Sequence, residues 1–515
     1  MKNNNNFYIL GVTLVATLGG LLFGYDTAVI SGAVESLRVF FIEPLGLPPG
    51  QASALEGFVV SSALIGCILG ASFAGWISQR YGRKPTLVLA AILFLLSAIG
   101  SAWPELGAGL PGSGDHTFMY HFVAYRVLGG VGVGLASMVS PMYIAEMAPA
   151  DRRGNLVAWN QFAIIFGMLV VYFVNYSIAL QGDAAWLHAT GWRWMFASGI
   201  IPASLFLLLL LFVPETPRYL VMRGREGRAQ GILERMMPTE AAGRELADIR
   251  ASFRVKAPSM RPYFQFMGTW LLLFLAGYGL LAALGFTSAL EVALLVSFCV
   301  ALLFPIRSFG ARIILVGILL SAFQQFVGIN VVLYYAPEIF KTMGAATDAA
   351  LLQQIVVGAV NLSFTTLAIF TVDKFGRRPL MIIGALVMAV SMLALGSTFY
   401  FRAVGIGSLV CMLVYTAGFA MSWGPVCWVL LAEIFPNSVR STVMSIAVAS
   451  QWIANFLVSW SFPMLDKSAF LTERFNHGMA YWLYGLMGLL AAWFIWRMIP
   501  ETKGKTLEEM ERYWK

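Results

Sequence analysis

The chain has 515 residues, of which 59% are hydrophobic and 12% are charged, and its mean hydropathy is +0.76. Soluble globular proteins carry about 25% charged residues, so this composition excludes an ordinary soluble domain and predicts a protein of the lipid bilayer. The formal net charge of +8 does not indicate nucleic-acid binding, because the basic residues lie in short loops between apolar runs.

Fourteen apolar stretches are long enough, at about 20 residues each, to cross a bilayer as helices. Six precede the one long polar segment and eight follow it, and residues 1–6 lead into the first stretch without a signal-peptide cleavage site. The predicted spans are 8–36, 55–78, 86–104, 118–144, 155–177, 192–213, 263–283, 288–306, 312–340, 350–372, 379–400, 407–432, 441–465 and 478–498.

The polar segment 217–262 alternates Arg with Glu and Ala, which predicts short amphipathic helices on the membrane surface. These helices would contact anionic lipid headgroups or form a solvated linker. The chain then divides into an N-terminal bundle (1–216), this linker (217–262), a pair of added spans (263–306) and a C-terminal bundle (307–515). The added pair is predicted to be a transmembrane hairpin, with an interfacial re-entrant pair as the alternative.

Lys and Arg lie in alternate loops and so predict the orientation of the spans. They follow the second span at Arg80, Arg83 and Lys84, whereas the segments 105–117 and 178–191 contain no Lys or Arg. Since basic loops stay in the cytoplasm, we expect both termini inside the cell and the chain in the cell (inner) membrane.

Three short motifs occur twice, in the same order. The sequence GRK at 82–84 matches GRR at 376–378, and PET at 214–216 matches PET at 500–502. A Glu and an Arg seven residues apart follow the fourth span of each half, at Glu146 and Arg153 and again at Glu433 and Arg440. The chain therefore consists of two related halves, the parallel-repeat layout of the major facilitator superfamily.

The same regions carry a family resemblance. The segments 17–26 (TLGGLLFGYD), 324–335 (QQFVGINVVLYY) and 424–428 (GPVCW), with PETPR at 214–218 and PETKG at 500–504, resemble the sugar porters of this superfamily, and especially the bacterial D-xylose–proton symporters. The resemblance covers nearly the whole chain except about 257–310. It implies an all-α fold of two six-helix bundles, to which this chain adds the pair of spans at 263–306.

Asp26 is a carboxylate inside the first span, and it predicts a functional site. A charged residue at this depth costs about 2.5–3.5 kcal/mol, so it requires a partner or a function. Arg126 in the fourth span lies at a similar depth, roughly 14–17 Å from the outer edge at 1.5 Å per residue. A proton on Asp26 would release Arg126, which would couple proton binding to a change of conformation. The alternative is a static ion pair.

Amide side chains in the spans both donate and accept hydrogen bonds, as sugar recognition requires, and aromatic rings can cover the apolar face of a sugar. The resemblance places this set in a monosaccharide site, for a substrate of the D-xylose or D-glucose type. The predicted substrate-binding residues are Phe23, Gln161, Gln324, Gln325, Asn330, Tyr334, Asn361, Gly424, Trp428, Gln451 and Trp452.

Charged residues in the basic loops are predicted to form salt bridges between the two bundles, which would hold the cytoplasmic side closed when the site faces outward. A network is required, because an exposed ion pair contributes only about 0–1 kcal/mol. The predicted gating residues are Arg83, Glu146, Arg153, Glu215, Arg377, Glu433, Arg440 and Glu501. The alternative is that these charges only set the topology.

The predicted function is proton-coupled uptake of a monosaccharide, with protons and the lipid bilayer as the other partners and no nucleic acid. The alternatives are a facilitative sugar uniporter, in which the Asp26–Arg126 pair is structural, and a sugar receptor that does not transport. No nucleophile–base set, cofactor motif or Cys/His metal spacing occurs in the sequence, so we expect no enzyme activity, no cofactor and no metal.

Overall fold

The structure is a computed structural model that describes residues 2–148, 153–254, 311–435 and 440–503, and these ranges are helical without a β-strand. Eleven helical segments among them are long and apolar enough to cross a membrane. Helix α22, which has 27 residues, is not one of the eleven but runs alongside them. The predicted spans at 263–283 and 288–306 lie outside the described residues.

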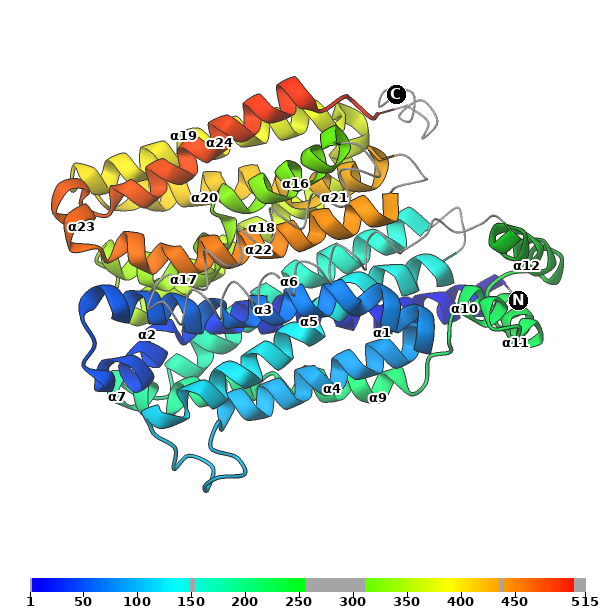
Figure 1. Ribbon diagram of the computed structural model, residues 1–515, viewed down its shortest axis with the longest axis horizontal. Coiled ribbons are helices and arrows are strands. Elements are labelled where there is room, and N and C mark those ends of the chain that lie inside the picture. Colours follow the sequence, from blue (N-terminus) through cyan, green and yellow to red (C-terminus); the bar gives the residue numbers. More distant parts are fainter. Residues whose placement is uncertain (1, 149–152, 255–310, 436–439, 504–515) are drawn as a thin grey trace.

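The N-terminal half packs its long helices side by side (Figure 1). Small residues allow close approach, which is how helices associate where lipid removes the hydrophobic drive. A Cβ at Gly24 of the first helix would lie 1.8 Å from the backbone oxygen of Ile164. The helices are α1 (Lys2–Ala28), α2 (Val34–Leu37), α3 (Pro49–Tyr81), α4 (Arg83–Ala102), α5 (Met119–Met147), α6 (Arg153–Ala179), α7 (Ala184–Trp186), α8 (Trp192–Ala197) and α9 (Ile200–Leu210).

The C-terminal half repeats this arrangement, and two of its spans are broken. The first break separates α16 from α17 at Gly328, whose φ of 91° is costly for residues with a side chain. The second separates α20 from α21 at Ser422. The helices are α16 (Ala311–Phe326), α17 (Ile329–Thr342), α18 (Thr347–Phe375), α19 (Arg377–Tyr400), α20 (Ile406–Met421), α21 (Trp423–Glu433), α22 (Arg440–Asp466), α23 (Ala469–Phe475) and α24 (Gly478–Met498).

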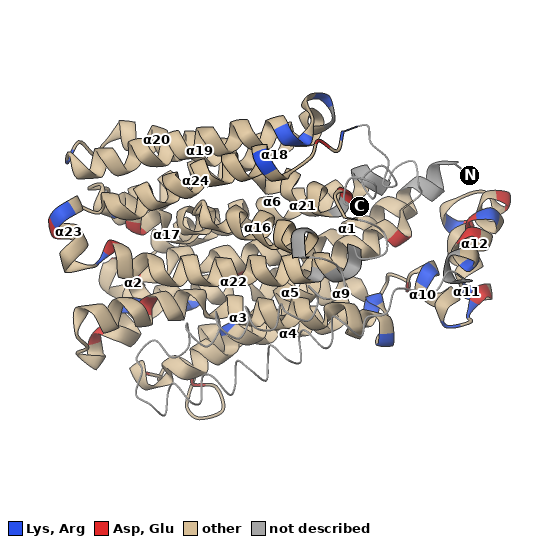
Figure 2. Ribbon diagram, turned by 45° about the horizontal axis from the view of Figure 1, so that its top comes forward, with Lys and Arg blue, Asp and Glu red and all other residues tan. Residues whose placement is uncertain are grey.

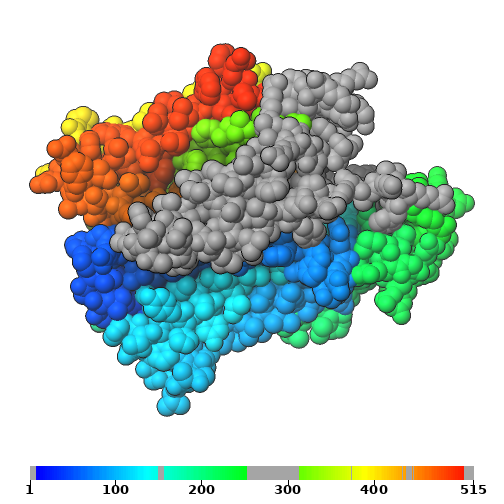
Figure 3. Space-filling model, viewed as in Figure 1, coloured from blue at the N-terminus to red at the C-terminus, as the bar shows by residue number. Residues whose placement is uncertain are grey.

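The polar segment forms the short helices α10 (Pro217–Met222), α11 (Glu226–Met236) and α12 (Thr239–Arg254), which confirms the helices predicted there. They lie beyond one end of the long helices, where α1 begins and α24 ends (Figure 1). Charged residues gather toward the ends of the long helices and leave the middle mainly uncharged (Figure 2), as a bilayer requires. The two halves form separate layers, from blue to cyan and from yellow to red in Figure 3.

Candidate functional site

A cavity of about 680 Å³ lies between the two halves. All eleven residues predicted to bind substrate line it, and they come from α1 and α6 on one side and from α16, α17, α18, α21 and α22 on the other. Gln324 and Gln325 both line this cavity from the last turn of α16, although neighbours on a helix point about 100° apart. The structure therefore brings the predicted residues together, while their role in binding stays a prediction.

Several cavity residues have buried polar atoms that no described residue satisfies. Gln324 donates from Nε2 to the Trp423 carbonyl at 2.8 Å, which fixes the amide and leaves its Oε1 without a partner among the described residues. The Oε1 of Gln451 and the Nε1 of Trp452 are also buried without a hydrogen-bond partner among the described residues. A buried polar group without a partner costs about 1–3 kcal/mol, so these atoms suit a ligand with several hydroxyl groups.

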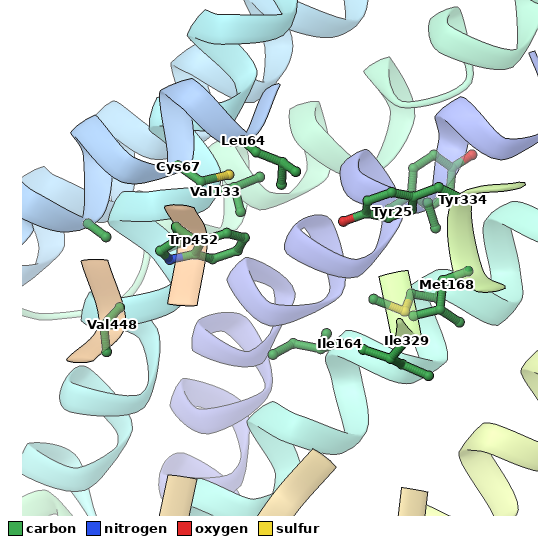
Figure 4. Packing of buried hydrophobic residues seen from close by; sticks show 14 of the residues in the cluster. Tyr25, Leu64, Cys67, Val133, Ile164, Met168, Ile329, Tyr334, Val448 and Trp452 are labelled. Carbon is green, nitrogen blue, oxygen red and sulfur yellow. The ribbon is translucent and has the colours of Figure 1, made fainter. Parts of the chain in front are cut away.

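Aromatic rings from both halves meet in the cavity. The ring centroids of Phe23 on α1 and Trp452 on α22 are 5.7 Å apart. Trp428 lies on α21, after the break at Ser422. Met168 and Tyr334 belong to the same packed group of buried side chains (Figure 4). The lining thus combines amides with flat apolar surfaces, as the two faces of a sugar ring require.

Sequence reasoning missed further polar residues of the cavity, namely Thr27, Asn160, Thr365 and Asn455. Asn455 lies four residues after Gln451 on α22, so the helical spacing that places side chains on one face could have identified it. Asn160 precedes Gln161 on α6, and it too is an amide inside a predicted span.

Asp26 contacts Arg126, and the pair lies outside the cavity lining. Arg126 Nη1 lies 3.2 Å from Asp26 Oδ1, and Nη2 donates to the Asp26 carbonyl at 3.2 Å. The Arg126 side chain is only 1% exposed, and its guanidinium stands 5.4 Å from the Phe196 ring centroid. The other carboxylate oxygen, Oδ2, is buried without a hydrogen-bond partner among the described residues.

The two sites lie on different faces of α1. Phe23 and Thr27, four residues apart, face the large cavity, whereas Leu22, Asp26 and Val29 face a separate cavity of about 10 Å³. A cavity of that size holds about one water molecule. Asp26 is therefore separated from the large cavity in this conformation, and α1 carries residues of both sites.

The repeated motifs build the same contact set in each half. In the N-terminal half, Arg83 binds Glu146 at 2.7 Å, and Glu215 accepts hydrogen bonds from the backbone N–H groups of Arg83 and Lys84 at 3.2 Å. Thr216 also donates to Glu146 at 2.6 Å. A carboxylate at a helix N-terminus satisfies free N–H groups and complements the helix dipole, so the PET motif caps α4.

The C-terminal half has the equivalent contacts at α19. Arg377 binds Glu433 at 3.0 Å, and Glu501 accepts from the backbone N–H groups of Arg377 and Arg378 at 3.1 Å. Thr502 donates to Glu433 at 2.7 Å.

In this conformation, which is open at the α10–α12 end, the contacts described above do not join the two bundles. Since the predicted bridges would form when this end is closed, they stay a prediction. The pairs just described each lie within one half, because each PET motif caps a helix of its own half and the cavity separates the halves at this end. The side chains of Arg153 and Arg440, which begin α6 and α22, are outside the described part of the structure.

Gly82, which precedes the capped helix α4, provides a test of this packing. Its φ of 114° and ψ of 163° belong to a region that only glycine adopts readily, and an added Cβ would lie 2.3 Å from Glu215 Oε2. Gly82→Ala is therefore expected to destabilise the fold by about 1–3 kcal/mol, measured as a lower thermal midpoint in detergent. Gly75→Ala, inside α3 where an added Cβ meets nothing within 4 Å, is the control. Equal midpoints for the two variants would contradict the close packing of Gly82 against Glu215.

At the opposite end from α10–α12, the halves touch. Lys341 on α17 forms an ion pair with Glu35 on α2, Lys467 Nζ lies 2.6 Å from Glu56 Oε1, and Trp460 donates from Nε1 to the Ala54 carbonyl at 3.0 Å. Each contact joins one half to the other. The cavity reaches Val157, Val372 and Arg377 at the α10–α12 end, so this conformation is open toward α10–α12 and closed at the other end.

The ion pair between Glu35 and Lys341 is expected to stay formed at ordinary pH. Burial raises the pKa of Glu35, but the hydrogen bond and charge of Lys341 more than offset it, so the pKa lies below its ordinary value of 4.5. A depressed acid pKa stabilises the pair above pH 4.5 and loses that contribution only as pH falls further. The shape of the uptake–pH curve between about pH 5 and pH 8 should therefore be the same for Glu35→Gln and the parent. A curve shifted within this window would assign the titration to Glu35.

Comparison with known proteins agrees with this geometry. The family described as "Sugar (and other) transporter" matches residues 12–292 and 300–514. The D-xylose-proton symporter of Escherichia coli K12 is 54% identical, with 99% of this chain and 96% of that protein covered, and the glucose facilitated diffusion protein of Zymomonas mobilis is 39% identical, with 98% and 97% covered. The inward open structure of the E. coli xylose transporter XylE matches with a TM-score of 0.82 and 51% identity, covering 98% of this chain and 100% of that one.

The fold and the cavity between two related halves define a membrane transporter of the major facilitator type. The chain belongs to the sugar transporter family, which the family match and the full-length relatives show. This confirms the resemblance and the fold class drawn from the sequence motifs.

Proposed function

We propose that this protein takes up a monosaccharide of the D-xylose type together with a proton, by alternating access. The observation that carries the proposal is the cavity between the halves, which is lined by the six predicted amides from five helices. The buried Asp26–Arg126 pair lies beside it, on another face of α1. The named activity of the 54% identical relative, a D-xylose-proton symporter, supports the same substrate and coupling ion.

Sugar binding uses the amides and the aromatic rings together. Gln324, held at Trp423, offers Oε1 to a hydroxyl group, and Gln325 and Asn330 are hydrogen-bonded to each other and can be pulled apart by a ligand. Trp428 covers an apolar face of the ring. Because residues of both halves contribute, a bound sugar stabilises conformations in which the halves close around it.

The proton acts at Asp26. While Asp26 is charged, its attraction holds Arg126 of α5 against α1, where both groups are almost fully buried. A proton removes that attraction. Because Gly24 packs directly on the α6 backbone, a shift of α1 moves α6 and the Gln161 side chain it carries. Proton and sugar are thus linked through the helix they share.

The basic loops and the position of α10–α12 support a cytoplasmic location for the open end of the cavity. The chain then resides in the inner membrane with both termini in the cytoplasm, in its inward-open conformation. We assign residues 1–216 and 307–515 to the two moving units, with 217–262 as the linker and 263–306 as an added hairpin. The Glu and Arg residues of the two motif sets hold the ends of α4 and α19 rigid, so that each half moves as one body at the gate.

Uptake of labelled D-xylose and D-glucose into proteoliposomes, with and without an imposed pH gradient, tests the proposal. We expect D-xylose to accumulate only when the outside is acidic, and accumulation to collapse when an uncoupler is added. Uptake that equilibrates and ignores the gradient would instead establish facilitated diffusion, the named activity of the 39% identical relative. Binding of sugar without flux would establish a receptor.

A further inference from the structure

Helix α17, which carries Asn330 and Tyr334 into the cavity, contains Pro337. Proline has no N–H group, so it cannot donate to the carbonyl four residues earlier. That carbonyl belongs to Leu333, which is only 5% exposed and also lines the cavity. A buried carbonyl without its helical partner requires another donor.

Two side chains supply this donor, one from each half of the protein. Gln354 on α18 donates from Nε2 to the Leu333 carbonyl at 3.1 Å, and Tyr172 on α6 donates from its hydroxyl at 3.3 Å. Gln354 belongs to the same half as Leu333, whereas Tyr172 reaches across from the N-terminal half. Both side chains are 1% exposed.

The Tyr172 ring is seated against the C-terminal half as well. A Cβ added at Gly358 on α18 would lie 2.8 Å from a ring carbon of Tyr172. The absence of a side chain at Gly358 therefore makes room for the ring, and the hydroxyl continues to the Leu333 carbonyl. Opening the end of the protein away from α10–α12 has to separate α6 from α17 and α18, and so has to break this contact.

A second proline within a helix has a comparable arrangement, but its carbonyl and its donor belong to the same half. Pro463 in α22 frees the carbonyl of Ser459, and Tyr335 donates to it at 2.9 Å. Tyr335 and Ser459 belong to the same half, so alternating access leaves that bond in place. At Leu333 the carbonyl has a second donor in its own half, Gln354, so breaking the bond from Tyr172 never leaves the carbonyl unsatisfied. The cost of about 1–3 kcal/mol for a buried orphan acceptor is avoided.

We propose that Tyr172 is a positioning residue that holds α17 over the sugar cavity from the opposite half, and that it releases α17 when the outer side opens. The inference rests on the alternating access proposed above. Tyr172 stabilises the inward-facing conformation through the Leu333 carbonyl, and Gln354 keeps that carbonyl satisfied in the outward-facing one.

The test compares Tyr172→Phe with Gln354→Met, because each variant removes one of the two donors to the same carbonyl. Ser53 on α3 serves as the reporter position, since it is 6% exposed and lies one helical turn from Gly57, which packs against Trp460 of the other half. Ser53→Cys is placed in a chain whose four native cysteines are replaced by alanine. Its labelling by a membrane-impermeant maleimide, added outside intact cells, reports opening of the outer side.

We expect labelling to be roughly fivefold faster in Tyr172→Phe, the factor that corresponds to one net hydrogen bond. In Gln354→Met we expect slower labelling than in the parent, because the Leu333 carbonyl then has no donor once Tyr172 leaves it. Equal rates in Tyr172→Phe and the parent, or the same increase in both variants, would overturn the proposal. Thermal midpoints of the purified variants show whether each one folds. If the parent carries no labelled sugar into proteoliposomes, the proposed function fails, while the labelling rates still decide whether Tyr172 holds the outer side closed.

Discussion

Asp26→Asn is expected to abolish accumulation of sugar against a gradient while leaving exchange of sugar across the membrane intact. Asn has nearly the same shape but carries no charge and cannot take up the coupling proton. A driving force of about 2.3 kcal/mol per 100 mV would support roughly 50-fold accumulation, and the variant should fall to a ratio of about one. Uphill uptake of labelled D-xylose and counterflow in proteoliposomes measure the two activities separately.

Asp348→Asn is the matched control, because Asp348 is an exposed carboxylate in the first turn of α18. It should retain both activities. If Asp26→Asn still accumulates sugar under a pH gradient, the Asp26–Arg126 pair is structural and the proton binds elsewhere. Loss of both activities in Asp26→Asn would show that the charge is needed for the conformational change itself.

Gln324→Ala is expected to lower sugar affinity by at least about fivefold. Its amide is fixed by the bond to Trp423, so its Oε1 is already oriented toward the cavity and little ordering is needed when sugar binds. Loss of one well-oriented hydrogen bond, together with the donor it leaves unpaired on the sugar, costs about 1–3 kcal/mol. Isothermal titration of purified protein with D-xylose measures the affinity directly.

Gln181→Ala, which removes an exposed amide just after α6, should bind sugar as the parent does. Unchanged affinity in Gln324→Ala would show that this residue does not bind the sugar. A lower thermal midpoint would then assign it a structural role, because its Nε2 joins α16 to the Trp423 carbonyl.

The predicted spans agree with the helices to within a few residues in most places, since the length of an apolar run directly reflects the thickness of the bilayer. The stretch at 379–400, for example, corresponds to α19 at Arg377–Tyr400. The sixth span begins earlier than expected, at Ala184 rather than 192, because the short helices α7 and α8 continue into it.

The amides were identifiable because a polar side chain in a lipid-facing position is costly, which sends Gln161, Asn361 and Gln451 inward. The eight gating residues were identifiable as a repeated set, but their partners were not. Sequence spacing relates residues of one helix, whereas Glu215 and Arg83 are 132 positions apart and meet only because PET folds back onto α4.

By itself the sequence determined the class of protein, the two related halves, the members of the amide and aromatic set and the Asp26–Arg126 pair. The halves follow from motifs repeated along the chain and the ion pair from the cost of charge in lipid, whereas the amide and aromatic set also rests on the resemblance to sugar porters. Only the tertiary structure decided which end of the cavity is open, that Asp26 and the cavity lie on different faces of α1, and that Tyr172 reaches the Leu333 carbonyl. These depend on how the two halves dock, and the docking of residues far apart in the chain leaves no periodic pattern in the sequence.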